Sequence, residues 1–132
     1  MVEENILTPV SKATDWVSSV VTVVKPNKLR IRIDSKDLSR AINQPHYPLP
    51  TVEEVATSLS KAKVFSVLDA KSGFWKVPLD EVSSRLTTFN IPFGRYRWLG
   101  MPFGISSAPE ELQKRMNNIF VDIKGPAVIV RC

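Results

Sequence analysis

The stretch VFSVLDAKSGFWKVPLD, residues 64–80, contains the pattern on which the fold depends most. Val64–Leu68 are mostly β-forming residues, and we expect them to form a buried strand that ends at Asp69. A Ser-Gly turn and the aromatic pair Phe74 and Trp75 follow directly. The carboxylate of Asp69 either caps this turn through its own side chain or binds a hard cation from a rigid position. The residues of this stretch alone leave both interpretations open.

The composition describes a basic chain of single-domain size. It has 132 residues, of which 43% are hydrophobic, so a packed core is expected. The formal net charge of +5 suits a polyanionic partner but says nothing about the fold. The single cysteine, Cys132, excludes an internal disulfide and fits a reducing compartment. Because we recognise no signal peptide or membrane span, we expect a soluble intracellular protein of the cytoplasm or nucleus.

The residues before this stretch predict a hairpin and two helices. VSSVVTVV (17–24) and LRIRID (29–34) flank a KPNK turn, which predicts a β-hairpin with one apolar and one charged face. A short helix is expected next, with Ser35 as its N-cap. The proline-rich QPHYPLP (44–50) predicts an extended connector. The TVEE sequence that begins at Thr51 is a capping box, so a second helix is expected to start there.

The residues after the stretch predict two strands, a helix and a further strand. RLTTFNIPFGRYRWLGMPFG (85–104) reads as two strands around a Pro-Phe-Gly turn, and AVIV (127–130) as a buried strand. SAPEELQKRMNNIFVDIKG (107–125) predicts a helix. Its expected buried stripe is Leu112, Met116, Ile119, Phe120 and Ile123. This order predicts an α+β fold with a mostly antiparallel sheet and helices on one face.

Few other residues indicate chemistry. Arg30 and Arg32 lie on one face of the predicted hairpin, where they either clamp a phosphate chain or form a solvated strand face. His46 is the only histidine and lies in the proline-rich connector, so a structural role is expected. Ser106 and Ser107 have no nearby histidine, which argues against a serine nucleophile. The sequence contains no phosphate-binding P-loop, GxGxxG or CxxC pattern.

Taken together, these stretches resemble the reverse transcriptase of gypsy-like LTR retrotransposons. LRIRIDSKDLSRAI is similar to the fingers motif, HYPLPTVEEV to the connector, VFSVLDAKSGFWKVPLD to motif A and MPFGISSAPEELQKRM to motif B. The similarity runs along nearly the whole chain, in the order of the family. It implies a right-hand polymerase architecture, with fingers and connector over about residues 1–63 and an incomplete palm over about 64–132.

The resemblance also implies the roles of individual residues. Asp69 matches the first metal-binding aspartate of motif A, which would hold Mg²⁺ for a two-metal mechanism, so metal binding becomes its favoured role. Arg30 and Lys36 match basic positions that bind the incoming deoxynucleoside triphosphate (dNTP). Phe74 matches the aromatic gate that clashes with a ribose 2′-hydroxyl. The motif B positions that line the template and nucleotide site are Gly104, Pro109 and Gln113. The implied partners are an RNA or DNA template–primer and dNTPs, with no membrane.

The chain departs from the family pattern where the next metal-binding motif is expected. Two adjacent aspartates should follow AVIV, but Arg131 and Cys132 stand there, so Asp69 is the one expected ligand that remains. An arginine about 4 Å from a cation adds repulsion of about 4 kcal/mol at an effective dielectric near ~20. Smaller departures are Arg32, Ser39, Gly100 and Leu112.

We therefore expect a truncated RNA-directed DNA polymerase domain that is catalytically inactive alone. Thumb, connection, ribonuclease H, protease and integrase regions are not recognised, so a ribonuclease H label taken from the parent polyprotein would have no supporting residues. The alternatives are a non-catalytic nucleic-acid-binding or interaction domain derived from a retrotransposon, or a non-functional remnant with an exposed sheet edge. The sequence makes no prediction of the oligomeric state.

Overall fold

The structure, a computed structural model, describes residues 2–43 and 46–123 and divides into two compact units. Met1–Gln44 and Ser72–Ala108 form the first, which we call the sheet unit. Pro45–Lys71 and Pro109–Cys132 form the second, the helical unit. The strand predicted at 127–130 lies outside the described residues, as do Arg131 and Cys132.

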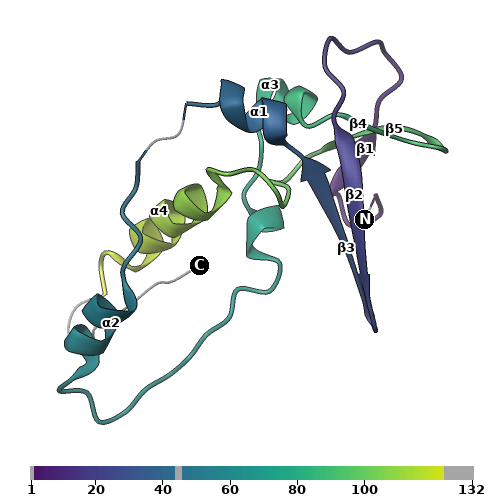
Figure 1. Ribbon diagram of the computed structural model, residues 1–132. Coiled ribbons are helices and arrows are strands. Elements are labelled where there is room, and N and C mark those ends of the chain that lie inside the picture. Colours follow the sequence, from purple (N-terminus) through teal and green to yellow (C-terminus); the bar gives the residue numbers. More distant parts are fainter. Residues whose placement is uncertain (1, 44–45, 124–132) are drawn as a thin grey trace. The chain divides into compact units, whose positions relative to one another are not determined.

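A β-hairpin forms in the sheet unit where the alternating pattern predicted one (Figure 1). Strand β2 (Ser19–Lys25) pairs antiparallel with β3 (Lys28–Asp34) along its full length. The turn between them contains Asn27 with φ 62°, a left-handed backbone conformation that asparagine tolerates. The Pro-Asn turn therefore sets the register of the hairpin.

The two faces of this hairpin differ in polarity, which confirms the prediction in part. Ile31 and Ile33 contribute to the hydrophobic core of the sheet unit. Arg30 and Arg32 alternate with them along β3, so they lie on the opposite face, and both are exposed. The cross-strand partners of these arginines are Val23 and Val21. The charged face is therefore mixed with valines instead of being wholly polar.

The second sheet of this unit has three strands in the order β1-β5-β4, all antiparallel. Its strands are β1 (Leu7–Pro9), β4 (Phe89–Ile91) and β5 (Gly94–Trp98). The turn at residues 92–93 joins β4 to β5, which confirms the predicted pair of strands. The α+β class with antiparallel sheets is confirmed.

One hydrophobic core connects both sheets of the sheet unit. Its buried members are Leu7, Ile33, Phe89 and Trp98. The rings of Phe89 and Trp98 lie 6.0 Å apart, within the usual range for aromatic pairs. Because Ile33 comes from β3 and the two aromatic residues come from β4 and β5, burial of this cluster holds the hairpin against the three-stranded sheet.

The sheet unit also contains three short helices. They are α1 (Lys36–Ala41), the 3₁₀ helix η1 (Gly73–Lys76) and α3 (Glu81–Leu86). The sequence predicted α1 but not α3, and residues 85–86, which were expected in a strand, belong to α3. A signal was present, because Asp80 is the N-cap and accepts a hydrogen bond from the backbone N–H of Ser83 at 2.7 Å.

The helical unit contains α2 (Val52–Leu59) and nearly all of α4 (Ala108–Phe120). The capping box at the start of α2 is confirmed, with the Glu54 carboxylate 2.7 Å from the Thr51 backbone nitrogen. Residues 46–50 have no regular structure, as predicted for the proline-rich connector. Among the residues that the structure describes, no helix is long and apolar enough to cross a membrane.

The buried stripe predicted for α4 is confirmed only in part, because Leu112, Met116 and Phe120 are half-buried. Ile119 is 66% exposed, Ile123 lies beyond the helix, and the buried residues of this helix are Ala108 and Gln113. An apolar stripe is buried only where another apolar surface covers it. Helix α2 does not cover the stripe closely, since none of the residues of α2 is itself buried.

The strand expected at Val64–Leu68 does not form. Residues 64–70 have no regular secondary structure and are exposed, and Figure 1 draws them within a long loop. A strand needs hydrogen bonds from a neighbouring strand, and the two sheets of the described residues are built only from β1–β5. The high β propensity of this segment is therefore not satisfied within the described part of the chain.

Candidate functional site

The segment that follows β5 is tied to the end of β3. The backbone N–H of Ile33 donates a hydrogen bond to the carbonyl oxygen of Phe103 at 3.2 Å, and the Ser35 hydroxyl donates one to the carbonyl oxygen of Gly104. The sequence predicted Ser35 as the N-cap of α1, but its side chain makes no capping hydrogen bond. The reason is that its hydroxyl contacts Gly104 and Ser39 instead.

Gly104 is at a position where only glycine fits without strain. Its φ of +108° lies in a region that residues with a side chain rarely adopt. A Cβ atom at this position would lie 2.5 Å from the carbonyl oxygen of Ile33, well inside van der Waals contact. The glycine thus permits the close approach of the MPFG segment to β3.

The hydrogen bond between Ser35 and Gly104 links the MPFG segment to the part of the chain that carries the two predicted basic residues, Arg30 and Lys36. Arg30 lies on β3, and Lys36 is the first residue of α1, directly after Ser35. Both basic side chains are exposed, and all of these residues belong to the sheet unit. A guanidinium and an ammonium group on one rigid body can bind the oxygens of a phosphate chain.

Phe74 lies in η1, directly after a tight turn in which Ser72 has φ 55°. Its ring is half-buried and meets the ring of Phe103 edge-on, with centroids 5.0 Å apart and planes at 74°. The ring of Trp75 also packs against Phe103, with the two ring centroids 5.8 Å apart. Sequence analysis missed Phe103, although it directly precedes Gly104 in motif B. The packing of Phe74 is thus visible, and its role as a gate stays a prediction.

Asp69 belongs to the helical unit and lies in the exposed segment without regular structure. The turn-capping alternative is not seen, because Asp69 accepts no hydrogen bond from any residue that the structure describes. The following turn is closed instead by the backbone N–H of Trp75, which donates to the Ser72 carbonyl oxygen at 3.0 Å. The expectation that a strand holds Asp69 rigidly is wrong for the described residues.

The side chains of the described residues do not form the multi-carboxylate centre that two-metal chemistry needs. Within residues 2–43 and 46–123, no three His, Cys, Asp or Glu side chains gather closely enough to hold a metal ion. A magnesium ion usually takes one or two carboxylates together with substrate phosphates, so Asp69 would supply one ligand at most.

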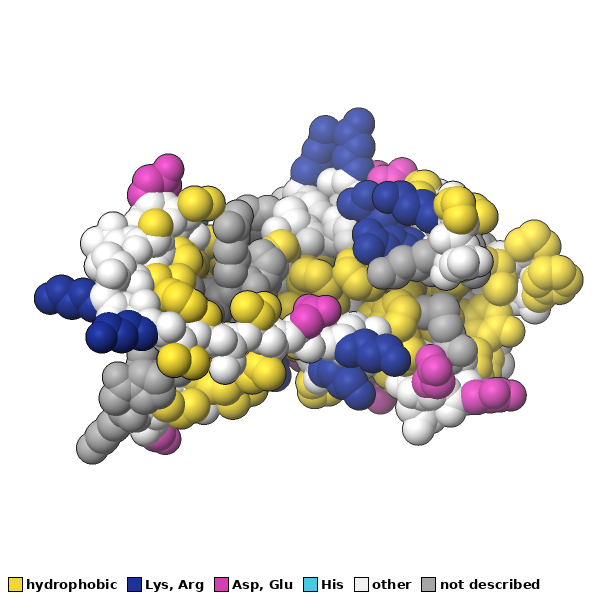
Figure 2. Space-filling view, turned by 90° about the horizontal axis from the view of Figure 1, so that it is seen from below, with side chains coloured by type: hydrophobic (Ala, Val, Ile, Leu, Met, Phe, Trp, Pro, Cys, Tyr) yellow, Lys and Arg dark blue, Asp and Glu magenta, His cyan; other side chains and the backbone are white. Residues whose placement is uncertain are grey.

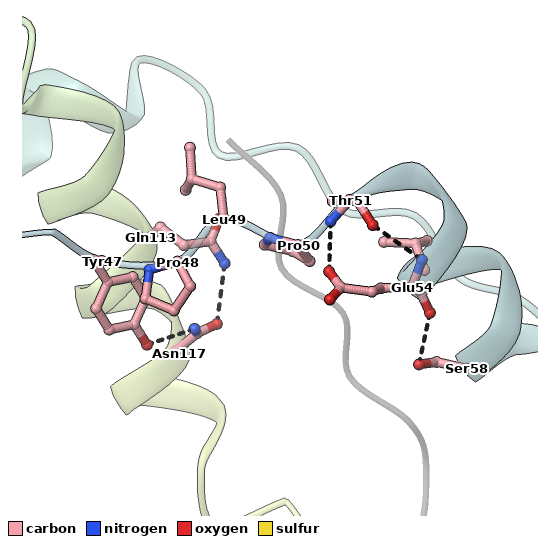
Figure 3. A pocket seen from close by; sticks show the side chains of 10 residues that line it. Tyr47, Pro48, Leu49, Pro50, Thr51, Glu54, Ser58, Gln113 and Asn117 are labelled. Carbon is pink, nitrogen blue, oxygen red and sulfur yellow. Dashed lines mark hydrogen bonds between the residues drawn. The ribbon is translucent and has the colours of Figure 1, made fainter.

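Gln113 lies at the centre of a polar network in the helical unit. Its side chain is 1% exposed, and its Nε2 donates a hydrogen bond to Oδ1 of Asn117 at 3.1 Å. The Nδ2 atom of Asn117 donates in turn to the hydroxyl of Tyr47 at 2.8 Å (Figure 3). This chain of hydrogen bonds fastens the proline-rich connector to α4.

A shallow cavity of about 430 Å³ lies beside this network. Its walls combine Leu49 and the prolines of the connector with polar side chains of α2 and α4, among them Glu54 and Gln113 (Figure 3). The cavity is therefore part apolar and part hydrogen-bonding. It contains Gln113 but not Asp69, and both residues belong to the helical unit.

The family model named "Reverse transcriptase (RNA-dependent DNA polymerase)" matches residues 12–131, so the chain belongs to the reverse transcriptase family. The enzymatic polyprotein of cauliflower mosaic virus (strain Strasbourg) is 40% identical over 93 residues, which cover 70% of this chain and 14% of the polyprotein. The Pol polyprotein of transposon 297 from Drosophila melanogaster is 38% identical over 93 residues, 70% of this chain and 9% of that protein. The chain thus spans a small part of its relatives, which are polyproteins of retroelements.

Solved structures with the same fold are reverse transcriptases. The protease-reverse transcriptase of prototype foamy virus aligns with a TM-score of 0.80 at 22% identity, over 98% of this chain and 17% of that one. The foamy viral enzyme in complex with an RNA/DNA hybrid aligns with a TM-score of 0.74 at 17% identity, over 98% and 17% of the two chains. At these identities the similarity shows the fold, and the fold is that of a reverse transcriptase.

Proposed function

We propose that this reverse transcriptase domain derives from a gypsy-like LTR retrotransposon and that its sheet unit binds the incoming dNTP. The junction between Ser35 and Gly104 carries this proposal, because it holds two exposed basic residues and the motif B glycine on one body. We propose further that the 132-residue chain does not polymerise DNA by itself. By the family resemblance, the boundary between fingers and palm falls near residue 63.

The binding proposal assigns a contact with the dNTP to three residues of the sheet unit. Arg30 and Lys36 bind the triphosphate oxygens, since paired charges give short and strong hydrogen bonds to phosphate. Phe74 lies against the deoxyribose and rejects a 2′-hydroxyl, supported by its edge-on contact with Phe103. Gln113, a motif B position by the family resemblance, is buried in the helical unit.

The inactivity proposal rests on the surroundings of Asp69. Two-metal phosphoryl transfer depends on ligands that hold the reacting oxygens in line, and an error of about 1 Å can cost on the order of 100-fold in rate. Asp69 lies in an exposed segment without regular structure, and Arg131 and Cys132 replace the expected aspartates. We therefore propose that Mg²⁺ is the cofactor of the parent enzyme and that this chain lacks the ligands to use it.

A primer-extension assay tests the inactivity proposal. The full chain is incubated with a primed RNA or DNA template, dNTPs and either Mg²⁺ or Mn²⁺, beside an Asp69→Ala variant. We expect no extension above the level of the variant, and we expect the RNA strand of a hybrid to stay intact. Extension by the unmodified chain that disappears in Asp69→Ala would contradict the proposal.

A second candidate is a non-catalytic nucleic-acid-binding domain, favoured by the exposed Arg30 and Arg32 and by the net charge of +5. Such binding is mostly electrostatic, so affinity should fall steeply with salt. The test is titration of a primer–template duplex at two salt concentrations. An Arg30→Ala/Arg32→Ala variant should bind more weakly at low salt, whereas Arg85→Ala serves as the control. Absence of binding at low salt would exclude this candidate.

A further inference from the structure

Gly100 lies against the backbone of Trp75, so closely that a side chain has no room. A Cβ atom at position 100 would lie 2.3 Å from the carbonyl oxygen of Trp75 and 2.9 Å from its carbonyl carbon. Both are backbone atoms, so no side-chain rotation relieves the collision. Unlike Gly94 and Gly104, Gly100 does not have a positive φ, so it is the contact and not the backbone conformation that requires glycine here.

Two backbone hydrogen bonds hold Gly100 in this place. The N–H of Met101 donates to the carbonyl oxygen of Val77 at 2.9 Å, and the N–H of Leu79 donates to that of Leu99 at 2.9 Å. Between these two bonds an antiparallel bridge joins the segments. Val77 and Met101 are both buried. The segment that carries Gly100 is therefore fastened to the residues that directly follow η1.

The close approach of η1 positions the ring of Phe74. This ring meets that of Phe103 edge-on, with centroids 5.0 Å apart, and the neighbouring Trp75 ring packs on Phe103 as well. The carbonyl oxygen of Phe103 accepts from the N–H of Ile33 in β3, the strand that carries Arg30. The position of Phe74 relative to Arg30 thus depends on how closely η1 packs against the segment that ends at Phe103.

Selection between sugars requires such a fixed ring, because charge does not distinguish them. Figure 2 shows groups of Lys and Arg side chains at the surface of the molecule, and such groups attract a triphosphate whatever sugar it carries. Rejection of a 2′-hydroxyl needs a repulsive contact, which an uncharged ring supplies only while it is held in place. A ring that is free to shift accommodates the extra hydroxyl.

We propose that Gly100 is a positioning residue for the sugar gate. Because it has no side chain, η1 approaches closely enough for Phe103 to hold the ring of Phe74. The inference rests on the proposed binding of a dNTP by the sheet unit. Gly100 itself touches no substrate and acts through the backbone of Trp75. It is one of the positions where the chain departs from the family pattern, so the inference does not follow from the family resemblance.

Equilibrium dialysis of the full chain with dATP, ATP and inorganic tripolyphosphate tests the inference. Gly100→Ala should push η1 outward, release the ring of Phe74 and lower the preference for dATP over ATP roughly tenfold. Tripolyphosphate has no sugar and should bind the variant as tightly as the unmodified chain. Gly94→Ala is the matched control. It introduces backbone strain, but its Cβ would meet only a side-chain atom of Tyr96, so it should leave the preference unchanged.

A double-mutant cycle separates positioning from a general loss of structure. Phe74→Ala removes the gate ring and should itself lower the preference for dATP. Adding Gly100→Ala should then have no further effect, because the ring that Gly100 positions is gone. If Gly100→Ala does not fold, Phe103→Leu provides a second test. It removes the edge-on contact without adding an atom beside the backbone of Trp75, and it should also lower the preference.

The outcomes distinguish this inference from the proposed function. An unmodified chain that binds neither dATP nor tripolyphosphate would contradict the proposed function, and the inference with it. Equal binding of dATP and ATP by the unmodified chain would overturn the gate. Where the unmodified chain prefers dATP, an unchanged preference in Gly100→Ala or Phe103→Leu would overturn only the role of Gly100. A further loss of preference when Gly100→Ala is added to Phe74→Ala would do the same.

Discussion

The hydroxyl of Ser35 donates a hydrogen bond to the carbonyl oxygen of Gly104, a residue 69 positions further along the chain. This bond joins the start of α1 to the segment after β5 and places them in one unit. The residues that we assign to nucleotide binding, Arg30 and Lys36, flank this junction in sequence. The stability of the sheet unit and its binding of a triphosphate should therefore both depend on it.

Ser35→Ala should destabilise the protein by about 0.5–1.5 kcal/mol, because it removes a part-buried hydrogen bond to the carbonyl oxygen of Gly104. The measurement is the free energy of unfolding from urea denaturation monitored by tryptophan fluorescence. Ser58→Ala is a matched control, since the Ser58 hydroxyl also donates to a backbone carbonyl oxygen, that of Glu54, but is exposed. Equal losses in the two variants would show that the Ser35 bond has no special role.

Gly104→Ala should be more destabilising than Gly94→Ala. Both glycines have positive φ, at +108° and +142°, so both substitutions introduce backbone strain of about 1–3 kcal/mol. Only at Gly104 would the new Cβ also collide with backbone, since the nearest neighbour at Gly94 is a Tyr96 side-chain atom at 3.7 Å. Thermal unfolding of both variants measures the difference. A Gly104→Ala protein as stable as Gly94→Ala would refute the close approach to β3.

The N-cap of α3 should make stability depend on pH. The backbone and side chain of Ser83 donate hydrogen bonds that lower the pKa of Asp80 below its usual range. A carboxyl whose pKa is lower in the folded than in the unfolded state stabilises the fold above its unfolded pKa. That contribution is lost as the pH falls through the folded-state pKa. The stability difference between the native protein and Asp80→Ala should thus be largest near neutral pH and shrink on acidification.

The Asp80→Asn variant tests the effect of the Asp80 charge separately from the effect of its capping hydrogen bond. Asparagine also caps helices but does not titrate, so its advantage over Asp80→Ala should stay constant as the pH falls. Melting temperatures of the three proteins over an acidic to neutral series provide the data. A constant difference between the native protein and Asp80→Ala would count against the assigned pKa shift.

Much of the fold could be predicted because its signals are local. Alternation in 29–34 predicted β3, the TVEE sequence predicted the start of α2, and the Pro-Phe-Gly turn predicted the β4–β5 hairpin. Each depends on residues that are close in sequence. Helix α3 was missed although its cap, Asp80, is also local, so that omission was avoidable.

The predictions that failed concern residues whose interaction partners are distant in the sequence, and the sequence alone does not identify those partners. Val64–Leu68 have the composition of a strand, but no described strand pairs with them. The contact of Ser35 with Gly104 crosses 69 positions, and its sequence suggested only a cap. The reason for glycine at position 100 was equally hidden, since a Cβ there would lie 2.3 Å from the carbonyl oxygen of Trp75.

The most direct test of the account is equilibrium binding of a dNTP to the full chain at low salt, measured by equilibrium dialysis. If the sheet unit binds the triphosphate, Arg30→Ala should weaken binding by about tenfold or more, because it removes a charge-assisted hydrogen bond. Arg85→Ala, which removes an exposed arginine paired with Glu81, should bind as the unmodified chain does. Absence of dNTP binding, or equal affinity in the Arg30→Ala variant, would contradict the account.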